Sequence, residues 1–331
     1  MHCELIVPGL FAEASGARVP ALELLLARGR ASSAESVSVE AWLQEQFGLD
    51  DETIAAGALT LAASGEEPQA HCWARADPVH LRLLRDRLIM VPSAAFTVSR
   101  EEADALVEAL NAHFGDRLWL KVVEPDRWCA RLERHLAFDA GSPLHAAGRD
   151  VDLALRIGGE AGRRWGTLLN EIQMLLHAHP VNQAREEHGE PMVNSLWLWG
   201  AGSAPKVAAS RWQSVTAAGP VALGLARLAG ARSRRLPASA AAWLEGSGDG
   251  RHLVLLDALR APLALGERAR YRECIEALEE TWFAPLLGAL RAGRVGMLTM
   301  HVPDSLGASF ETIRGDLRRF WRRPKALEKY A

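Results

Sequence analysis

The sequence predicts an α/β fold with a mostly parallel sheet. In the second half of the chain, short apolar runs bounded by turn residues alternate with amphipathic segments, as strands alternate with their covering helices. The chain also opens on an apolar run at 3–7, which ends at Pro8-Gly9 and precedes a helix with Pro20 at its start and Gly29 at its stop. The 331 residues, 49% of them hydrophobic, are enough for one large or two ordinary domains.

Local signals place the remaining elements. Ser99 and Glu102 form a capping box at the start of the clearest helix, and Gly115 ends it. Pro180 ends a second long helix because the residue before a proline leaves the α region, and Pro285 predicts a kink in a third. We expect further strands at 88–91, 117–123, 195–199, 252–256 and 295–300, and helices at 163–179, 216–230, 270–291 and 310–323.

Composition excludes several classes of function. The formal net charge of -3 and the pI of about 6.4 give no electrostatic case for nucleic acid. The four cysteines show neither the spacing of zinc ligands nor that of a disulfide framework. No run approaches the roughly 20 apolar residues of a membrane span. We therefore expect a cytoplasmic protein with no membrane or nucleic-acid partner.

One basic, aromatic stretch near the C-terminus, "RGDLRRFWRRPK", is of the kind that binds nucleic acid. However, Ile313, Leu317, Phe320 and Trp321 form an apolar stripe at helical spacing. The sequence therefore predicts a helix docked on the core, with the arginines on its solvated face.

A polar run precedes the expected strand at 195–199. His179, Asn182 and Arg185 come directly after the long helix, where a loop at the edge of a cleft is expected. His177 and His179 cannot share a metal from a helix, because residues two apart lie on nearly opposite faces. We expect His179 to form a hydrogen bond in the cleft.

The strand itself, "SLWLW", is followed by Gly-Ala-Gly. Alternation of Trp197 and Trp199 with leucines indicates a strand buried on both faces, so both indoles are predicted to belong to the core. Gly200 and Gly202 then provide a flexible strand end, which is where α/β proteins usually bind ligands.

These stretches resemble a known family. "HPVNQAREEHGEPMVNSLWLWGAG", followed by "TAAGPVALGLARLAG", resembles a segment of the archaeal-type cofactor-independent phosphoglycerate mutases and their bacterial relatives, some of them proposed to be homoserine kinases. "RADPVHL" and "FTVSREEADALVEALNAHFGDRLWLKVVEPDRW" follow the family's order of elements, so the likeness extends over about residues 70–245. The chain also looks like small bacterial proteins described as regulators of pathogenicity factors.

The resemblance implies the alkaline phosphatase-like fold, a central mixed sheet flanked by helices with an inserted smaller domain. It implies a core of residues 1–75 and 165–331 and an inserted domain of 76–164. At Asp77 the family favours Asn, and the extra negative charge counts against a phosphate at that position. The residues to which the resemblance gives a substrate-side role are His179, Asn182, Arg185, Arg127 and Arg75.

The chain also departs from the family. Active members hold two divalent metals with Asp and His and use a Ser nucleophile, but Pro8 stands where the first Asp ligand belongs. Glu13 is an unsupported substitute, and Ser15 would be an unactivated alcohol without metals. The weak candidates that remain as metal ligands, with altered spacing, are Asp257, His301 and Asp304.

Two hypotheses of function follow. The first is a phosphoglycerate mutase-like protein with degenerate metal ligands and no cofactor, which binds a small phosphorylated or carboxylate metabolite or regulates a protein partner without catalysis. The alternative is an active phosphomutase or phosphatase with rearranged ligands for Mn or Zn. The missing Asp favours the first hypothesis, and the retained HPVN and WGAG segments favour the second.

Overall fold

The computed structural model describes residues 1–13, 16–50, 53–84, 87–132, 141–147, 159–304 and 307–330. The chain forms two compact units: unit 1 is Met1–Asp50 with Val207–Ala331, and unit 2 is Asp51–Lys206. Unit 2 is wider than the segment 76–164 expected from the resemblance. The reason is that β3 (Cys72–Leu84), which crosses the expected boundary at 76, pairs in one sheet with β7 (Ser195–Gly202), which follows the segment.

Unit 1 is built on a seven-stranded mixed sheet in the order β2-β12-β11-β1-β10-β8-β9. Strands β11, β1, β10, β8 and β9 run parallel, while β12 and β2 are antiparallel additions at one edge. The predicted α/β class with a mostly parallel sheet is confirmed. The strands are β1 (His2–Ile6), β2 (Arg30–Ser33), β8 (Ser214–Ala217), β9 (Arg232–Arg235), β10 (Arg251–Leu255), β11 (Met297–Val302) and β12 (Ala308–Ile313).

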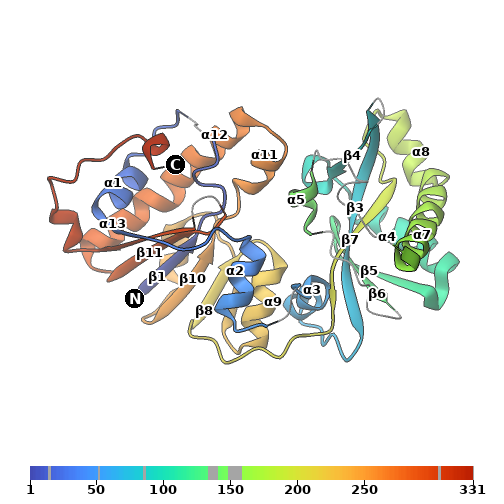
Figure 1. Ribbon diagram of the computed structural model, residues 1–331, viewed down its shortest axis with the longest axis horizontal. Coiled ribbons are helices and arrows are strands. Elements are labelled where there is room, and N and C mark those ends of the chain that lie inside the picture. The colour runs from blue at the N-terminus through green and yellow to red at the C-terminus, as the bar shows by residue number, and fades with distance from the viewer. Residues whose placement is uncertain are drawn as a thin grey trace. The chain divides into compact units, whose positions relative to one another are not determined.

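Helices cover both faces of this sheet (Figure 1). The main core lies between the sheet and α1, α10, α12 and α13, and it includes Leu5, Val254, Phe283 and Met300. Helices α2 and α9 lie on the opposite face. The helices are α1 (Pro20–Arg28), α2 (Val39–Gln46), α9 (Pro220–Leu228), α10 (Ala240–Glu245), α11 (Arg260–Ala264), α12 (Arg268–Leu278) and α13 (Ala284–Ala292).

The third long helix is interrupted where Pro285 predicted an irregularity. A π-helical turn, Glu279–Phe283, separates α12 from α13 directly before this proline, which has no N–H to continue the ladder. The turn also buries Glu279, whose carboxylate accepts hydrogen bonds from the N–H groups of Ala21 (2.6 Å) and Leu22 (3.1 Å). This carboxylate therefore caps the positive end of α1.

The helix predicted at 310–323 is wrong. Ala308–Ile313 forms β12 because it pairs with both β11 and β2, and a single 3₁₀ turn, Asp316–Arg318, follows it. Phe320 and Trp321 do not pack on the core but are 77% and 67% exposed. The apolar stripe was a coincidence of spacing, and tertiary strand pairing overrode it.

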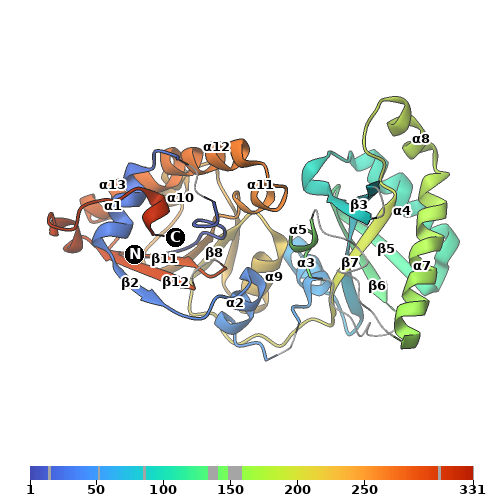
Figure 2. The same cartoon turned by 45° about the horizontal axis from the view of Figure 1, so that its top comes forward.

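Unit 2 is a five-stranded antiparallel sheet in which β3 pairs with β4, β6 and β7, and β6 pairs with β5. Helices α4 and α7 cover one face and α3 the other (Figure 2). The capping box of Ser99 and Glu102 is present at the start of α4. The further elements are β4 (Arg87–Pro92), β5 (Leu118–Glu124), β6 (Arg127–Leu132), α3 (Ala56–Ser64), α4 (Arg100–Phe114), α5 (Pro143–Ala146), α7 (Gly159–His177) and α8 (Pro180–Glu187).

The sequence predicts a loop after the long helix, but the structure begins α8 at Pro180. Proline suits the first position of a helix, and the imidazole of His179 caps it by accepting a hydrogen bond from the N–H of Val181 (3.2 Å). Among the described residues, no helix is long and apolar enough to cross a membrane.

Close packing of α3 against the sheet depends on glycine. Gly200 has φ +57, and a Cβ there would collide with the Cβ of Ala56 and come within 2.8 Å of the carbonyl oxygen of Ile54. The Gly-Ala-Gly end of β7 thus has a packing function: all eight residues of β7 are buried.

We therefore expect Gly200→Ala to lower the free energy of unfolding by on the order of 2 kcal/mol or more, from backbone strain and overpacking. Urea titration followed by circular dichroism measures this change. Gly166→Ala in α7 is the matched control, because a Cβ there meets nothing within 4 Å. It should leave stability unchanged or raise it, and equal losses in both variants would contradict the packing argument.

Candidate functional site

The alternation of β3 separates apolar from polar side chains. Ala74 and Ala76 lie in the core beneath α4 and α7. Arg75 and Asp77 therefore project from the opposite face, on which α3 packs. Strand pairing brings Trp199 of β7 opposite Arg75 on this face.

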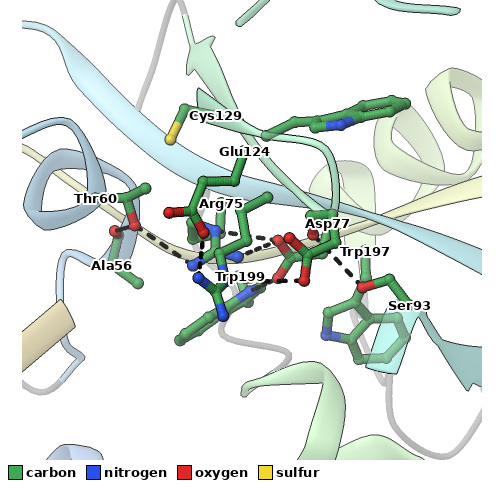
Figure 3. A network of polar contacts seen from close by, with 12 residues as sticks. Ala56, Thr60, Arg75, Asp77, Ser93, Glu124, Cys129, Trp197 and Trp199 are labelled. Atoms are coloured by element: carbon green, nitrogen blue, oxygen red, sulfur yellow. Dashed lines mark hydrogen bonds and ion pairs between the residues drawn. The ribbon is translucent and has the colours of Figure 1, made fainter. Parts of the chain in front are cut away.

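Arg75 and Asp77 form a buried pair at the centre of a polar network (Figure 3). The Nε of Arg75 donates to Oδ1 of Asp77 (3.1 Å), and its Nη1 lies 3.4 Å from the Oγ1 of Thr60. Trp199 donates from Nε1 to Oδ2 of Asp77 (2.7 Å), and its ring lies 5.6 Å from the guanidinium of Arg75. Burial raises the pKa of Asp77, although Arg75 and Trp199 oppose the shift. The carboxylate of Asp77 compensates the positive charge of Arg75, so this arginine attracts an anionic ligand only weakly.

Arg127 lies at the start of β6, beside the same network. It forms an ion pair with Glu124, and Asp126 lies 4.0 Å from its Nε. Burial would lower the pKa of Arg127, but these two carboxylates and Asp77 raise it. The side chain of Arg127 is 27% exposed, against 6% for Arg75.

Both indoles of the predicted strand are buried, which confirms their assignment to the core: Trp197 is 2% exposed and Trp199 is 7% exposed. They nevertheless contribute polar contacts, since Trp197 donates from Nε1 to the carbonyl of Gly141 (2.9 Å). The tryptophans thus supply apolar surface and two fixed donors to the polar face of unit 2.

The three residues of the HPVN…R segment lie on α8 or at its N-cap, but each makes different contacts. His179 caps α8, and burial lowers its pKa. Asn182 is completely buried. Its side-chain Nδ2 donates hydrogen bonds to the carbonyls of Leu176 (2.7 Å) and Val193 (2.8 Å), and its Oδ1 accepts one from the N–H of Val193 (2.8 Å). Asn182 therefore clips the end of α7 to the segment that enters β7.

Arg185 is also structural. It is 3% exposed, and its Nη1 contacts both carboxylate oxygens of Glu102 (2.8 and 2.9 Å). Its Nε donates to the carbonyl of Pro191 (2.8 Å) and its Nη2 to that of Thr97 (2.9 Å). Every nitrogen of the guanidinium thus has a protein partner, so a ligand would have to displace Glu102, the residue that completes the capping box of α4.

Unit 1 has its own polar cluster at the carboxyl edge of the sheet. Asp257 follows β10 and Asp304 follows β11, the two neighbours of β1. Asp304 accepts a hydrogen bond from the N–H of Gly9 (3.0 Å), in the turn after β1. The guanidinium of Arg260 donates a hydrogen bond from Nη2 to Oε1 of Glu40 (2.9 Å). Burial would lower the pKa of Arg260, but Glu40, Asp257 and Asp304 raise it.

His301 faces a different group. Its Nδ1 lies 2.8 Å from the Oγ of Ser309, and its Nε2 lies 3.6 Å from Oε2 of Glu4. Glu4 is 1% exposed and pairs with Arg251 and, at 3.7 Å, with Arg211. Burial would raise the pKa of Glu4, but His301 and Arg251 outweigh it and hold the pKa at about 2.

Two of the three candidate ligands have partners within the protein: His301 faces Glu4, and Asp304 accepts a hydrogen bond from the N–H of Gly9. Pro8 has no side-chain group that could bind a metal ion. Arg260 adds a fixed positive charge among the carboxylates, which repels a divalent cation. Among the described residues, no group of three or more His, Cys, Asp or Glu side chains is arranged to hold a metal ion. Ser15 lies outside the described residues, and Glu13 forms an ion pair with Arg268 (3.2 Å).

Sequence reasoning missed Arg260, Glu40 and Glu4. Glu4 had a usable signal, because a lone carboxylate inside the apolar run "CELIV" must find a partner when the strand is buried. Arg260 and Glu40 had none, because 220 positions separate them in the chain.

Comparisons with known proteins agree with the resemblance. No protein-family model matches the chain. One match is to a 2,3-bisphosphoglycerate-independent phosphoglycerate mutase of Methanosarcina barkeri, with 32% identity over 118 residues. The matched stretch makes up 33% of this chain and 28% of that enzyme. Longer matches at 28% identity cover 58% of this chain and about half of such an enzyme from Methanosarcina mazei (50%) and of a probable one from Geobacter sulfurreducens (51%). The chain thus spans about half the length, or less, of these curated relatives.

Among solved structures, a Pyrococcus horikoshii protein matches with a TM-score of 0.53 and 15% identity, over 94% of this chain and 86% of that one. A cofactor-independent phosphoglycerate mutase of Thermoplasma acidophilum matches with a TM-score of 0.47 and 17% identity, over 95% and 90%. The first match shows a shared α/β fold. The sequence matches confirm that the chain is similar to cofactor-independent phosphoglycerate mutases.

Because Arg185 is enclosed by protein groups, we expect Arg185→Ala to destabilise unit 2 by on the order of 3 kcal/mol, since it leaves two carbonyls and Glu102 without their donor. Arg185→Lys should not rescue this loss, because one ammonium group cannot reach both carbonyls and Glu102. Chemical unfolding of each variant measures both effects. Arg100→Ala, which removes an exposed ion pair with Asp104 in the same unit, is the control and should cost less than about 1 kcal/mol. Full stability of Arg185→Ala would argue against the structural role.

Proposed function

We propose that this phosphoglycerate mutase-like chain binds a ligand or regulates a partner without transferring a phosphoryl group. The observation that carries the proposal is the ion pair of Arg260 with Glu40 at the carboxyl edge of the unit 1 sheet, where Asp257 and Asp304 also raise the pKa of Arg260. Two-metal phosphoryl transfer requires carboxylates that are free to neutralise and hold divalent cations. Here a guanidinium of the chain itself compensates those carboxylates.

A second candidate keeps the enzymatic activity. Asp257 and Asp304 remain at the ends of the two strands that flank β1, as an active phosphomutase or phosphatase with rearranged ligands for Mn or Zn would require. That function needs Arg260 to leave the carboxylates and Asp304 to release the N–H of Gly9. Both steps cost charge-assisted contacts, which places this candidate second.

For the ligand, we propose a small phosphorylated or carboxylate metabolite held by Arg127. The side chains of the other two predicted arginines, Arg75 and Arg185, are 6% and 3% exposed, whereas that of Arg127 is 27% exposed. Its present partners are Glu124, 23% exposed, and Asp126, 43% exposed and 4.0 Å away, so an incoming anion competes with two carboxylates at the surface of unit 2. A protein partner would meet the same surface. Competition of this kind favours weak binding.

The first prediction from the proposed function concerns metal binding and activity. Mn²⁺ should not raise the melting temperature of the wild type, and 3- and 2-phosphoglycerate should not interconvert when Mn²⁺ or Co²⁺ is added. Arg260→Gln removes the positive charge from among Glu40, Asp257 and Asp304, so Mn²⁺ should raise the melting temperature of this variant by about 2 °C or more. Thermal unfolding with and without the metal measures the difference.

Arg268→Gln is the control, since Arg268 pairs with Glu13 and is 84% exposed. Two equivalents of metal retained by the wild type after dialysis would refute the proposal. So would metal-dependent turnover that is lost in Asp257→Ala or Asp304→Ala, and that result would establish the second candidate.

The second prediction concerns the metabolite. Arg127→Ala should weaken binding of 3-phosphoglycerate, or of any anion found by thermal-shift screening, about tenfold or more, because a charge-assisted hydrogen bond contributes about 1.5–3 kcal/mol. Glu124→Gln should tighten binding, since it removes one of the two competing carboxylates and leaves only Asp126, 4.0 Å from Arg127. Calorimetry of both variants, with Arg100→Ala as the control, measures the two opposite shifts. If no anion binds the wild type, or if Glu124→Gln leaves the affinity unchanged, the ligand does not lie at Arg127.

A further inference from the structure

The basic, aromatic stretch near the C-terminus forms one wall of a hollow in unit 1. The hollow has a volume of about 750 Å³, and its other wall comes from the end of α1, the start of β2 and Phe310 of β12. Its cationic and aromatic lining side chains include those of Arg30, Arg322, Arg323, Lys325, Trp321 and Tyr330.

Contacts on both sides hold this wall in place. Before it, Arg319 pairs with Asp316 (2.7 Å) and donates to the carbonyl of Arg28 (3.2 Å). After it, Leu327 is buried in the main core and Tyr330 packs against that core. The segment 320–325 between these anchors is exposed at every position. Its side chains are therefore presented to solvent by a backbone that is fixed at either end.

The hollow is positively charged. The described residues that line it include four with cationic side chains and none with a carboxylate side chain. Arg322 donates to the carbonyl of Gly29 (2.7 Å) at the end of α1, so part of its charge stabilises the helix terminus. Arg323 and Lys325 form no ion pair with any residue that the structure describes. These two cations are available to an anion.

The hollow also offers an aromatic face. Trp321 is 67% exposed and packs edge-on against Phe320, with ring centroids 5.3 Å apart. An exposed tryptophan beside uncompensated cations has both groups that a planar anion needs, a stacking surface and a charge partner. A plain phosphate would use the cations alone, and an apolar ligand would use the ring alone.

We propose that this hollow binds a free nucleotide, with the base stacked on Trp321 and the phosphate held by Arg323 and Lys325. The volume lies within the range of about 300–1,000 Å³ typical of small-molecule sites. Arginine and lysine both bind phosphate through charge-assisted hydrogen bonds. The net charge of -3 favours a single nucleotide over a nucleic-acid strand, whose phosphates a net-negative protein repels. This site shares no residue with the function proposed above.

The test is titration of the full chain with adenosine 5′-monophosphate, followed by calorimetry and tryptophan fluorescence. Trp321→Ala should weaken binding about fivefold or more, the loss expected for one stacked base. The double variant Arg323→Ala/Lys325→Ala should weaken it about tenfold or more and reduce its salt dependence. Because these side chains are exposed, all variants should unfold at the wild-type midpoint.

Trp119→Ala is the matched control: Trp119 is also an exposed tryptophan beside an arginine, Arg131, but it lies in unit 2. It should bind the nucleotide as the wild type does. Inorganic phosphate should bind more weakly than the nucleotide, and a short single-stranded oligonucleotide should bind no more tightly. The proposal is overturned if the nucleotide does not bind, if Trp321→Ala binds it equally well, if phosphate alone binds as tightly, or if the oligonucleotide binds more tightly.

Discussion

Pairing of buried charges within the protein is the constraint on which the polar architecture of this chain depends. An ionised group removed from water is stable only when an opposite charge and hydrogen bonds replace the lost solvent. Asp77 meets Arg75, Glu4 meets Arg251, and Arg185 meets Glu102. The first pair lies within β3, whereas the pair of Glu4 and Arg251 joins β1 to β10 and the pair of Arg185 and Glu102 joins α8 to α4. In these last two pairs the contacts that satisfy the charges also hold neighbouring elements together.

The same constraint changes what the resemblance to phosphoglycerate mutases means. The resemblance rests on the HPVN and WGAG segments, yet the structure uses those residues for packing. Asn182 and Arg185 bind backbone carbonyls, and Gly200 admits α3. Residues can therefore persist because the fold needs them, whether or not chemistry does. Similarity at these positions reports a shared architecture more directly than a shared reaction.

Some glycines and prolines also shape contacts with residues far away in the sequence, which local sequence patterns do not predict. Gly29 ends α1 as predicted, but it also lies against Thr312 of β12, where a Cβ would fall 2.6 Å from the hydroxyl oxygen. Pro285 interrupts its helix as predicted, and the resulting π turn places Glu279 at the start of α1. In both cases the sequence predicts the local effect on the helix, but not the distant segment that the helix contacts.

The sequence by itself determined the α/β class, the positions of β1, β4, β5, β7, β10 and β11, the capping box at Ser99 and the burial of Trp197 and Trp199, because periodicity and capping act within a few residues. Tertiary structure decided the unit boundaries, the β12 strand at 308–313 and the partners of every candidate site residue. Strand pairing joins segments far apart in the chain, and it can override local propensity. Ion pairs such as that of Arg260 with Glu40 exist only once the strands have been ordered in the sheet.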